Sequence, residues 1–184
     1  MAASPAATFI QLPSPNEPNH AVYGALLRPG LLERFGAYGN SIFASDVYRS
    51  GSRGSDGEGG GQRANKPVQI VYFDCLIGPR LTGHDGIVHG GILALLFDEA
   101  CGWGYEGLTY GWGKLGSSDQ PGMTANLSVN FKLPLKAGTP CVMRVYLERV
   151  EGRKLFFRAT LEGATGEEVY ADASCLMVAL RSRL

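Results

Sequence analysis

The stretch from residue 90 to residue 103, GGILALLFDEACGW, places apolar side chains on most faces of a predicted helix. A surface helix carries its apolar residues on one stripe, whereas a helix that is apolar nearly all round is buried. The rest of the chain must therefore wrap this helix. The carboxylates of Asp98 and Glu99 stand out in such a setting, because burying a charge is costly unless the charge has partners.

The segments around this helix are typical of strands. Residues 68–77 (VQIVYFDCLI) are rich in β-branched and aromatic residues, which favour strands. After the helix, turns containing glycine or proline separate four further strand candidates: residues 122–132, 139–150, 153–162 and 168–180. This order predicts an α+β fold in which a curved antiparallel sheet wraps around a long central helix. Because the sheet covers only one side of the helix, the open flank favours a dimer.

The beginning of the chain lacks this regularity. Residues 1–19 are rich in Pro, Ala, Ser and Asn and predict a disordered or surface-draped arm. Residues 20–37 predict two short helices, and the glycine-rich residues 50–66 predict a flexible connection. We therefore expect an N-terminal extension over residues 1–67 and one main domain over residues 68–184.

Charge and composition limit the partners that we expect. The 17 Lys and Arg residues balance the 17 Asp and Glu residues, whereas proteins that bind nucleic acid or anionic membranes usually carry a basic excess. No stretch approaches the roughly 20 apolar residues of a membrane span, and the amino terminus lacks the basic region of a secretory signal. We therefore expect a cytoplasmic protein without nucleic-acid or membrane partners.

The cysteines and histidines give no sign of a metal site. The four cysteines lie far apart in apolar segments and form no CxxC pair, as is typical of buried, reduced thiols. The three histidines are not spaced as zinc ligands. We expect no bound metal.

The segment GHDGIVHGGILALLFDEACGWG is followed in order by the strings TANL, NFK-P and EGRK. Over about residues 68–180 the chain resembles the hotdog-fold acyl-CoA thioesterases of the phenylacetate-pathway type, and among them the thioesterase superfamily members of animals and fungi. The combination of HGG, an aspartate nine residues after its histidine, and TANL is specific. The resemblance implies a hotdog fold, with sheets that run on side by side across a homodimer. Two such dimers could associate further.

The glycine pair Gly90–Gly91 suits a thioester carbonyl. The first N–H groups of a helix have no partner within the helix and carry a partial positive charge, which stabilises a developing oxyanion. Gly91 has no Cβ, so a carbonyl oxygen can approach its N–H closely. The alternative is that both glycines only allow the helix to pack tightly on the sheet.

Asp98 could deprotonate a water molecule or attack the acyl carbon itself. The alternative is a buried aspartate that backbone donors or an arginine satisfy. The resemblance places the family's catalytic acid on Asp98 rather than Glu99, and a hydroxyl that orients the acid or the water on Thr124. It also implies that His89 orders the loop before the helix and can hydrogen-bond near the thioester, although a capping or packing role fits equally well.

The resemblance further implies an active site shared between two subunits, with Gly91 of one subunit facing Asp98 and Thr124 of the other. Coenzyme A, or the phosphopantetheine of a carrier protein, would enter as part of the substrate, and we expect no separate cofactor. Gly90 and Asn126 would contact the substrate. The phosphates would lie near basic side chains: Lys132, Lys136, Arg153 or Lys154.

More residues than the family pattern contains lie between Asp98 and Thr124. The aromatic residues of this stretch could form an acyl-pocket wall, or anchor a surface loop: Trp103, Tyr105, Tyr110 and Trp112. Thioester hydrolysis is the main prediction. The alternatives are a hotdog dehydratase, isomerase or cyclase that sets His84 or His89 against Asp98 or Glu99, and a non-catalytic acyl-binding protein.

Overall fold

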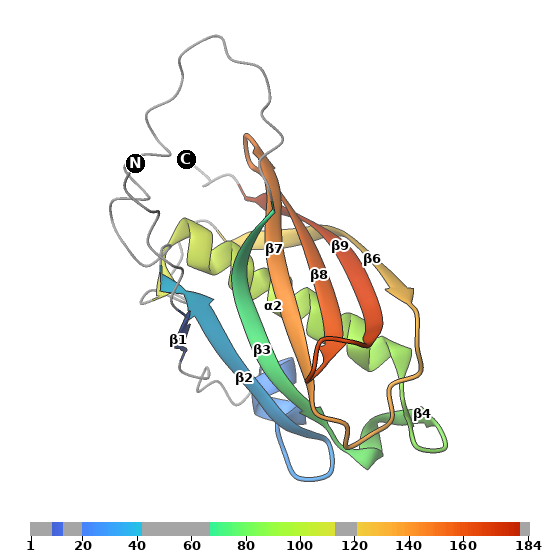
Figure 1. Ribbon diagram of the computed structural model, residues 1–184. Helices are drawn as coiled ribbons and strands as arrows, with labels where there is room; N and C mark the ends of the chain where they lie inside the picture. The colour runs from blue at the N-terminus through green and yellow to red at the C-terminus, as the bar shows by residue number, and fades with distance from the viewer. Residues whose placement is uncertain (1–8, 13–19, 42–66, 113–120, 181–184) are drawn as a thin grey trace, which may run out of the picture.

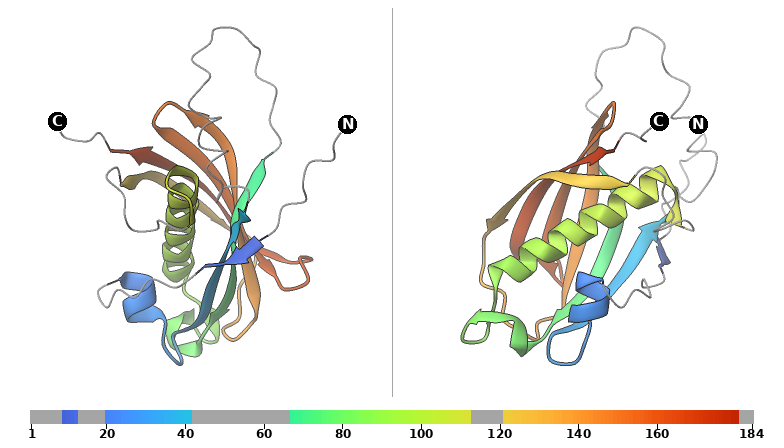
Figure 2. Two further views of the ribbon diagram at one scale, coloured as in Figure 1. Left: turned by 90° about the vertical axis from the view of Figure 1, so that its left-hand side faces the viewer. Right: turned by 180° about the vertical axis from the view of Figure 1, so that it is seen from behind.

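The computed structural model describes residues 9–12, 20–41, 67–112 and 121–180. A seven-stranded sheet curves around one long helix, α2 (Gly90–Thr109), which crosses its concave face (Figures 1 and 2). Its strands are β1 (Phe9–Gln11), β2 (Leu32–Asn40), β3 (Val68–Ile77), β6 (Gly122–Phe131), β7 (Cys141–Glu151), β8 (Lys154–Gly163) and β9 (Val169–Ala179). The remaining elements are the short helices η1 (Ala21–Leu26) and η3 (Pro79–Leu81), and the hairpin of β4 (Thr82–His84) and β5 (Ile87–Val88).

The strand order is β1-β2-β3-β7-β8-β9-β6, and all neighbours are antiparallel. Along β8 and most of β7, buried residues that face α2 alternate with residues that face outward, as an antiparallel sheet with one covered face requires. The predicted α+β hotdog architecture is confirmed, and the five predicted strands lie within two residues of the observed bounds. Within the described residues, no helix combines the length and the apolar character needed to cross a membrane.

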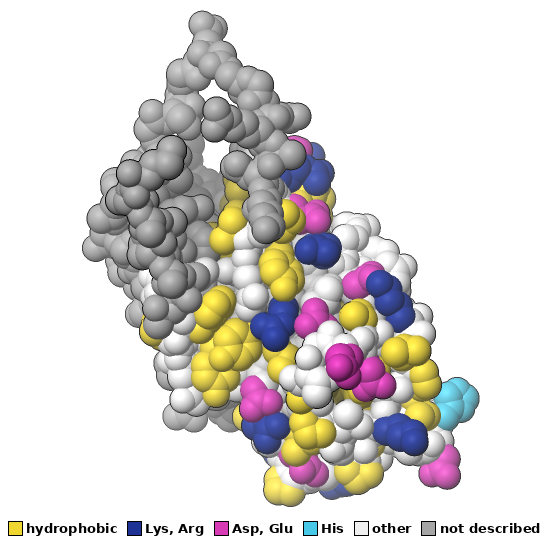
Figure 3. Space-filling view, viewed as in Figure 1, with side chains coloured by type: hydrophobic (Ala, Val, Ile, Leu, Met, Phe, Trp, Pro, Cys, Tyr) yellow, Lys and Arg dark blue, Asp and Glu magenta, His cyan; other side chains and the backbone are white. Residues whose placement is uncertain are grey.

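The outer face of the sheet carries paired charges (Figure 3). The Nε of Arg144 lies 3.2 Å from Oε2 of Glu162, and its guanidinium lies 5.9 Å from the ring centre of Tyr72. Arg158 lies similarly over Tyr146, at 5.2 Å. These contacts let long side chains cover apolar surface while their charges stay in water.

Helix α2 is longer than predicted. It continues past residue 103 to Thr109, and Gly111, with φ of 75°, follows its end. The prediction of an aromatic loop is therefore wrong for Trp103 and Tyr105, which are buried helix residues. Tyr110 is the C-terminal cap residue of the helix.

Trp112 is also part of the core. Its indole packs against Gly107 of α2 and Gly39 of β2, since a Cβ built on these glycines would lie 2.1 Å and 2.4 Å from the ring. Its Nε1–H donates to the carbonyl of Asn40 at 2.8 Å. Glycine is required at position 107 because the ring occupies the space that a side chain would need. Glycine is unfavourable within helices, so this part of α2 resembles a loop in the sequence. Residues 113–120 of the predicted loop lie outside the described residues.

The N-terminal extension is also not separate from the main domain. Residues 32–40 form β2, which pairs with β3 and buries Leu32, Phe35 and Ala37 against the core. The prediction of two helices in residues 20–37 is right only for η1, and the boundary at residue 67 divides one continuous sheet. The predicted arm lies largely outside the described residues, as does nearly all of the glycine-rich connection.

The four cysteines are buried free thiols, as predicted. The fold brings them together in two pairs that the sequence does not reveal. Cys75 and Cys141 lie opposite each other on β3 and β7, and Cys101 of α2 contacts Cys175 of β9. Burial raises the pKa of Cys75 well above the ordinary thiol value, which keeps it in the unreactive protonated form.

Candidate active site

The first turn of α2 is capped by the side chain of His89. The residue has extended backbone angles (φ −67°, ψ 130°), and its Nδ1 accepts a hydrogen bond of 2.9 Å from the N–H of Gly91. The ring is held between two glycines. A Cβ on Gly83 would lie 2.7 Å from Cδ2 of the ring, and a Cβ on Gly91 would lie 3.0 Å from Nδ1. Of the two roles left open for His89, the structure shows the cap.

Two turns further along α2, Asp98 faces strand β6. The hydroxyl of Thr124 donates a hydrogen bond of 2.6 Å to Oδ1 of Asp98. The ladder between β6 and β9 shifts register between Thr124 and Asn126, where β6 passes this carboxylate. Asp98 is half-buried and Thr124 is exposed. The structure thus joins the predicted acid and the predicted hydroxyl within one chain, next to exposed Asn126.

Gly91 and Asp98 lie on the same face of α2 but far apart. The seven residues between these positions (98 − 91) correspond to about 10 Å along the axis and to nearly two full turns. A carbonyl that accepts from Gly91 and is attacked beside Asp98 needs both groups within about 3–4 Å. Within one chain the two groups are therefore too far apart to act on the same carbonyl.

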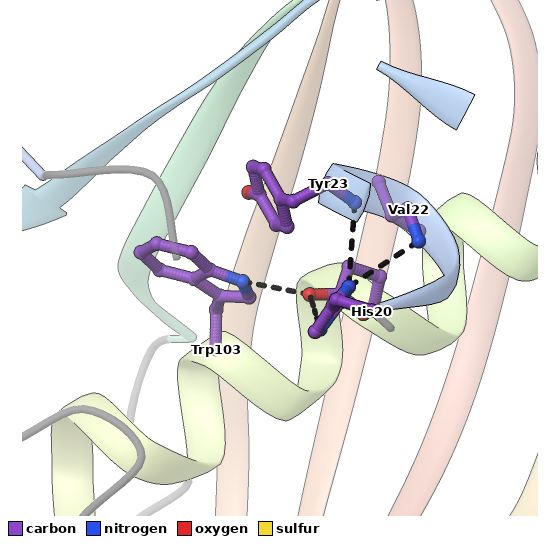
Figure 4. Close-up of polar contacts among 5 residues, drawn as sticks. His20, Val22, Tyr23 and Trp103 are labelled. Atoms are coloured by element: carbon purple, nitrogen blue, oxygen red, sulfur yellow. Dashed lines mark hydrogen bonds and ion pairs between the residues drawn. The ribbon is translucent and has the colours of Figure 1, made fainter. Parts of the chain in front are cut away.

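A second carboxylate, Glu99, lies on another face of the same turn. Figure 4 shows Trp103 of α2 beside the N-terminal residues His20, Val22 and Tyr23, which gather at this face. Its Oε1 accepts a hydrogen bond of 2.9 Å from Nε1–H of Trp103 and lies 3.5 Å from Nε2 of His20. The other imidazole nitrogen, Nδ1, accepts from the N–H groups of Val22 and Tyr23, both at 3.3 Å, and so caps η1. His20 thereby connects the N-terminal segment to α2.

Burial dominates the electrostatics of this cluster. It raises the pKa of Glu99, while His20 and the Trp103 N–H lower that pKa in part. Burial and the charge of Glu99 also raise the pKa of the Tyr23 hydroxyl, which has no hydrogen-bond partner among the described residues. Sequence reasoning missed the cluster because its members lie in distant segments; the one signal was a second acidic residue in an apolar helix.

The basic residues predicted to bind phosphates lie at two ends of the sheet. Lys132 follows β6 and forms an ion pair with Asp172, whose pKa this contact lowers. Lys136 is exposed in the same connection. Arg153, in the β7–β8 turn at the opposite end, donates to the carbonyl of Ala179 at 2.8 Å, beside exposed Lys154. One chain does not bring these four side chains together.

Two other predicted groups lie close to the helix start. Gly90 contacts Phe131, since a Cβ on Gly90 would lie 3.1 Å from Cζ of that ring. His84 is exposed on the β4–β5 hairpin. Trp103 and Tyr105 face the interior of the fold. They could line a pocket for the acyl chain only if the core opened.

Part of the chain is similar to one protein family. Residues 85–170 match the family model of the thioesterase superfamily. The acyl-coenzyme A thioesterase THEM4 of Bos taurus is 33% identical over 103 residues, which are 56% of this chain and 38% of that protein. The chain thus spans well under half the length of this relative.

Solved structures share the fold at low identity. A hypothetical thioesterase from Streptococcus pneumoniae, solved with coenzyme A, has a TM-score of 0.52 at 17% identity, covering 62% of this chain and 83% of that one. The PaaI protein of the E. coli phenylacetic acid degradation operon has a TM-score of 0.52 at 10% identity, covering 64% and 80%. Similarity at this level establishes the hotdog fold.

Proposed function

Because residues 85–170 match the family model of the thioesterase superfamily, we propose that this protein hydrolyses an acyl thioester of coenzyme A. The observation that carries the proposal is the 2.6 Å hydrogen bond between Thr124 and Asp98, which fixes a half-buried carboxylate beside the edge strand β6. The relative named an acyl-coenzyme A thioesterase and the similar fold solved with coenzyme A support this substrate over a carrier protein.

In the proposed reaction the thioester carbonyl accepts a hydrogen bond from the N–H of Gly91. Thr124 occupies Oδ1 of Asp98, so Oδ2 is available to take a proton from a water molecule as its oxygen bonds to the acyl carbon. The Gly91 N–H and the helix terminus stabilise the oxyanion that forms. The C–S bond then breaks, and the thiolate takes up the proton that Asp98 accepted, which gives free coenzyme A and a carboxylic acid and restores the Asp98 carboxylate. Direct attack by Asp98 would give an anhydride, which water hydrolyses to the same products.

We further propose that the complete site forms in a homodimer. Strand β6 is the last strand of the sheet, and Met123 and Phe131 near its ends are 50% and 57% exposed. Antiparallel pairing with β6 of a second chain around the middle of the strand would bring the Phe131 end, beside Gly90, next to the Thr124 end of the other chain. Each Asp98 would then meet the Gly91 of the other subunit. The association of two dimers and a cytoplasmic location stay predictions.

The same pairing suggests where coenzyme A binds. It would place Arg153 and Lys154 of one chain at the same end of the joined sheet as Lys132 and Lys136 of the other. These four side chains, with Asn126 and Gly90, remain our candidates for substrate contacts. No cofactor beyond the coenzyme A of the substrate is proposed.

Release of free thiol from a panel of straight-chain and aryl acyl-CoAs tests the proposal. We expect hydrolysis by the wild type and loss of hydrolysis in Asp98→Asn, with binding of an S-alkyl-CoA retained in calorimetry. Unchanged hydrolysis by Asp98→Asn would refute the site. A 3-hydroxyacyl-CoA arm covers the dehydratase alternative, because enoyl absorbance would rise there without thiol release. Binding without any turnover would indicate an acyl-binding protein.

A further inference from the structure

One of the five glycines of α2 is not explained by packing within the chain. A Cβ would lie 3.1 Å from a neighbouring side chain at Gly90, 3.0 Å at Gly91, 3.3 Å at Gly104 and 2.1 Å at Gly107. At Gly102, by contrast, a Cβ would meet nothing among the described residues within 4 Å, apart from its own stretch of helix. Glycine weakens the interior of a helix relative to alanine, so the space at Gly102 needs another explanation.

Gly102 lies one turn after Asp98, on the open flank of α2. Four residues correspond to about 6 Å along the helix axis and to a rotation of only about 40° between the two positions. Cys101 and Trp103, which point to either side of Gly102, are buried, whereas Gly102 is partly exposed. The open space therefore borders the carboxylate that accepts a hydrogen bond from Thr124.

We propose that this space receives the acyl chain of the substrate, and that Gly102 determines which acyl groups the protein accepts. The inference rests on the proposed function, because it starts from a thioester carbonyl beside Asp98. An extended hydrocarbon chain covers the roughly 6 Å between the two positions in about five carbon–carbon bonds. Acyl groups of about six carbons or more therefore reach Gly102, whereas acetyl and butyryl groups end before it.

A side chain at position 102 would lie in the path of such an acyl chain. The interior beside this turn is filled by Trp103 and Tyr105, which are 6% and 1% exposed, so the acyl chain extends along the flank of the helix. Contact with this flank removes apolar surface from water, and the affinity rises with the area that is covered. The substrate class is thus a thioester with a medium or long apolar acyl group.

Two thioethers that cannot be hydrolysed, S-ethyl-CoA and S-octyl-CoA, isolate the space at Gly102 from the rest of the site. Gly102→Leu fills this space with a residue that favours helices. We expect it to raise the Kd of S-octyl-CoA by about tenfold to a hundredfold, because the outer part of the chain loses its contacts. The Kd of S-ethyl-CoA should change by less than about twofold, since this chain ends before position 102. Calorimetry measures both values.

Gly102→Ala is the matched variant, because it removes the disadvantage of glycine in a helix and adds only one methyl group. It should raise the melting temperature and change the Kd of S-octyl-CoA by less than about threefold. Equal changes for both thioethers in Gly102→Leu, or an unchanged Kd for S-octyl-CoA, would overturn the inference. Equal changes together with a smaller dimer fraction in native mass spectrometry would assign the space to a second chain instead.

Asp98→Asn keeps this inference apart from the proposed function. If Asp98→Asn abolishes hydrolysis while Gly102→Leu binds both thioethers as the wild type does, the inference fails and the proposed function stands. If the wild type hydrolyses no acyl-CoA but its affinity for S-octyl-CoA depends on Gly102, the acyl site is supported and the proposed reaction fails.

Discussion

Asp98 and Glu99 are adjacent carboxylates on one turn of α2, but different elements surround them. Asp98 is half-buried, faces the edge strand and accepts from a hydroxyl of β6. Glu99 points toward the N-terminal segment, where an indole and an imidazole hold it. Successive helix residues point about 100° apart. Asp98 therefore faces the edge strand β6, whereas Glu99, the next residue, faces His20 at the start of η1.

This difference shows that the role of a carboxylate on α2 depends on which segment covers its face of the helix. Thr124 donates to Oδ1 of Asp98, and Oδ2 lies beside the last strand of the sheet. Glu99 is held by Trp103 of its own helix and by His20, which fastens residues 20–26 to the helix. Chemistry is therefore expected from the carboxylate that the chain leaves incomplete, and stability effects from the one that it encloses.

The largest expected effect separates the two carboxylates by activity. Asp98→Asn removes the proton acceptor and should lower kcat by about a thousandfold. Glu99→Gln keeps an oxygen for Trp103 and should leave kcat within about threefold of the wild type. Thiol release from one acyl-CoA measures both, and far-ultraviolet circular dichroism checks that both variants fold. A loss of similar size in Glu99→Gln would show that the enclosed carboxylate takes part in the reaction.

The next prediction tests whether the missing half of the Asp98 site comes from another chain. Gly91→Val blocks the amide half-site and Asp98→Asn disables the acid, so each variant alone should be nearly inactive. After mixing, unfolding and refolding together, half of the dimers are mixed, and one of their two sites carries neither substitution. Activity should rise to about one quarter of the wild-type value by this statistical count. No recovery, with mixed dimers verified by native mass spectrometry, would place the whole site within one chain.

The sequence predicts those features of the fold and the site that depend on patterns within a single segment. Apolar residues at helical spacing predict α2 from its first glycine, and β-branched runs predict β3 and the four strands after the helix. Asp98 stands out as a charge in an apolar helix. Thr124 is identified only through the family resemblance, and the structure then joins it to Asp98.

The missed features depend on contacts between distant segments. In LERFGAYGN, the register shift between Leu32 and Arg34 hides the strand alternation of β2. The end of α2 looks like a loop because Gly107 makes room for a tryptophan ring that follows the helix. The environment of Glu99 depends on His20, 79 residues earlier in the chain (99 − 20), and no local pattern encodes such a pair.

A third prediction removes the donor from each carboxylate. Thr124→Val deletes the hydroxyl that donates to Asp98 and should lower kcat by about tenfold, as for one hydrogen bond to a charged group. Thr124→Ser should retain most of the activity. Trp103→Phe deletes the donor to Glu99 and should instead lower the free energy of unfolding by about 1–2 kcal/mol, with kcat within about twofold. Denaturation and thiol-release assays on all three variants measure both quantities. Loss of activity in Trp103→Phe, or loss of stability alone in Thr124→Val, would contradict the comparison.

The smallest effect concerns the charge of Glu99. Burial raises its pKa, although His20 and Trp103 offset part of the rise. The folded state then holds the proton more tightly than the unfolded chain, so stability falls as pH rises above the ordinary glutamate pKa of about 4.3. Glu99→Gln should therefore melt about 2–4 °C above the wild type at neutral pH, for a gain of about 1 kcal/mol.

The pH dependence of this difference identifies its cause. It should shrink as pH falls toward the ordinary glutamate pKa, because both proteins then carry a neutral side chain at this position. Glu167→Gln, at an exposed turn residue, is the control and should melt with the wild type at every pH. A Glu99→Gln protein that melts below the wild type at neutral pH would mean that the His20 contact outweighs the cost of burial. The charge of Glu99 would then stabilise the attachment of the N-terminal segment to α2. Asp98 and Glu99 would in that case differ in their hydrogen-bond and ion-pair partners, and burial would not distinguish them.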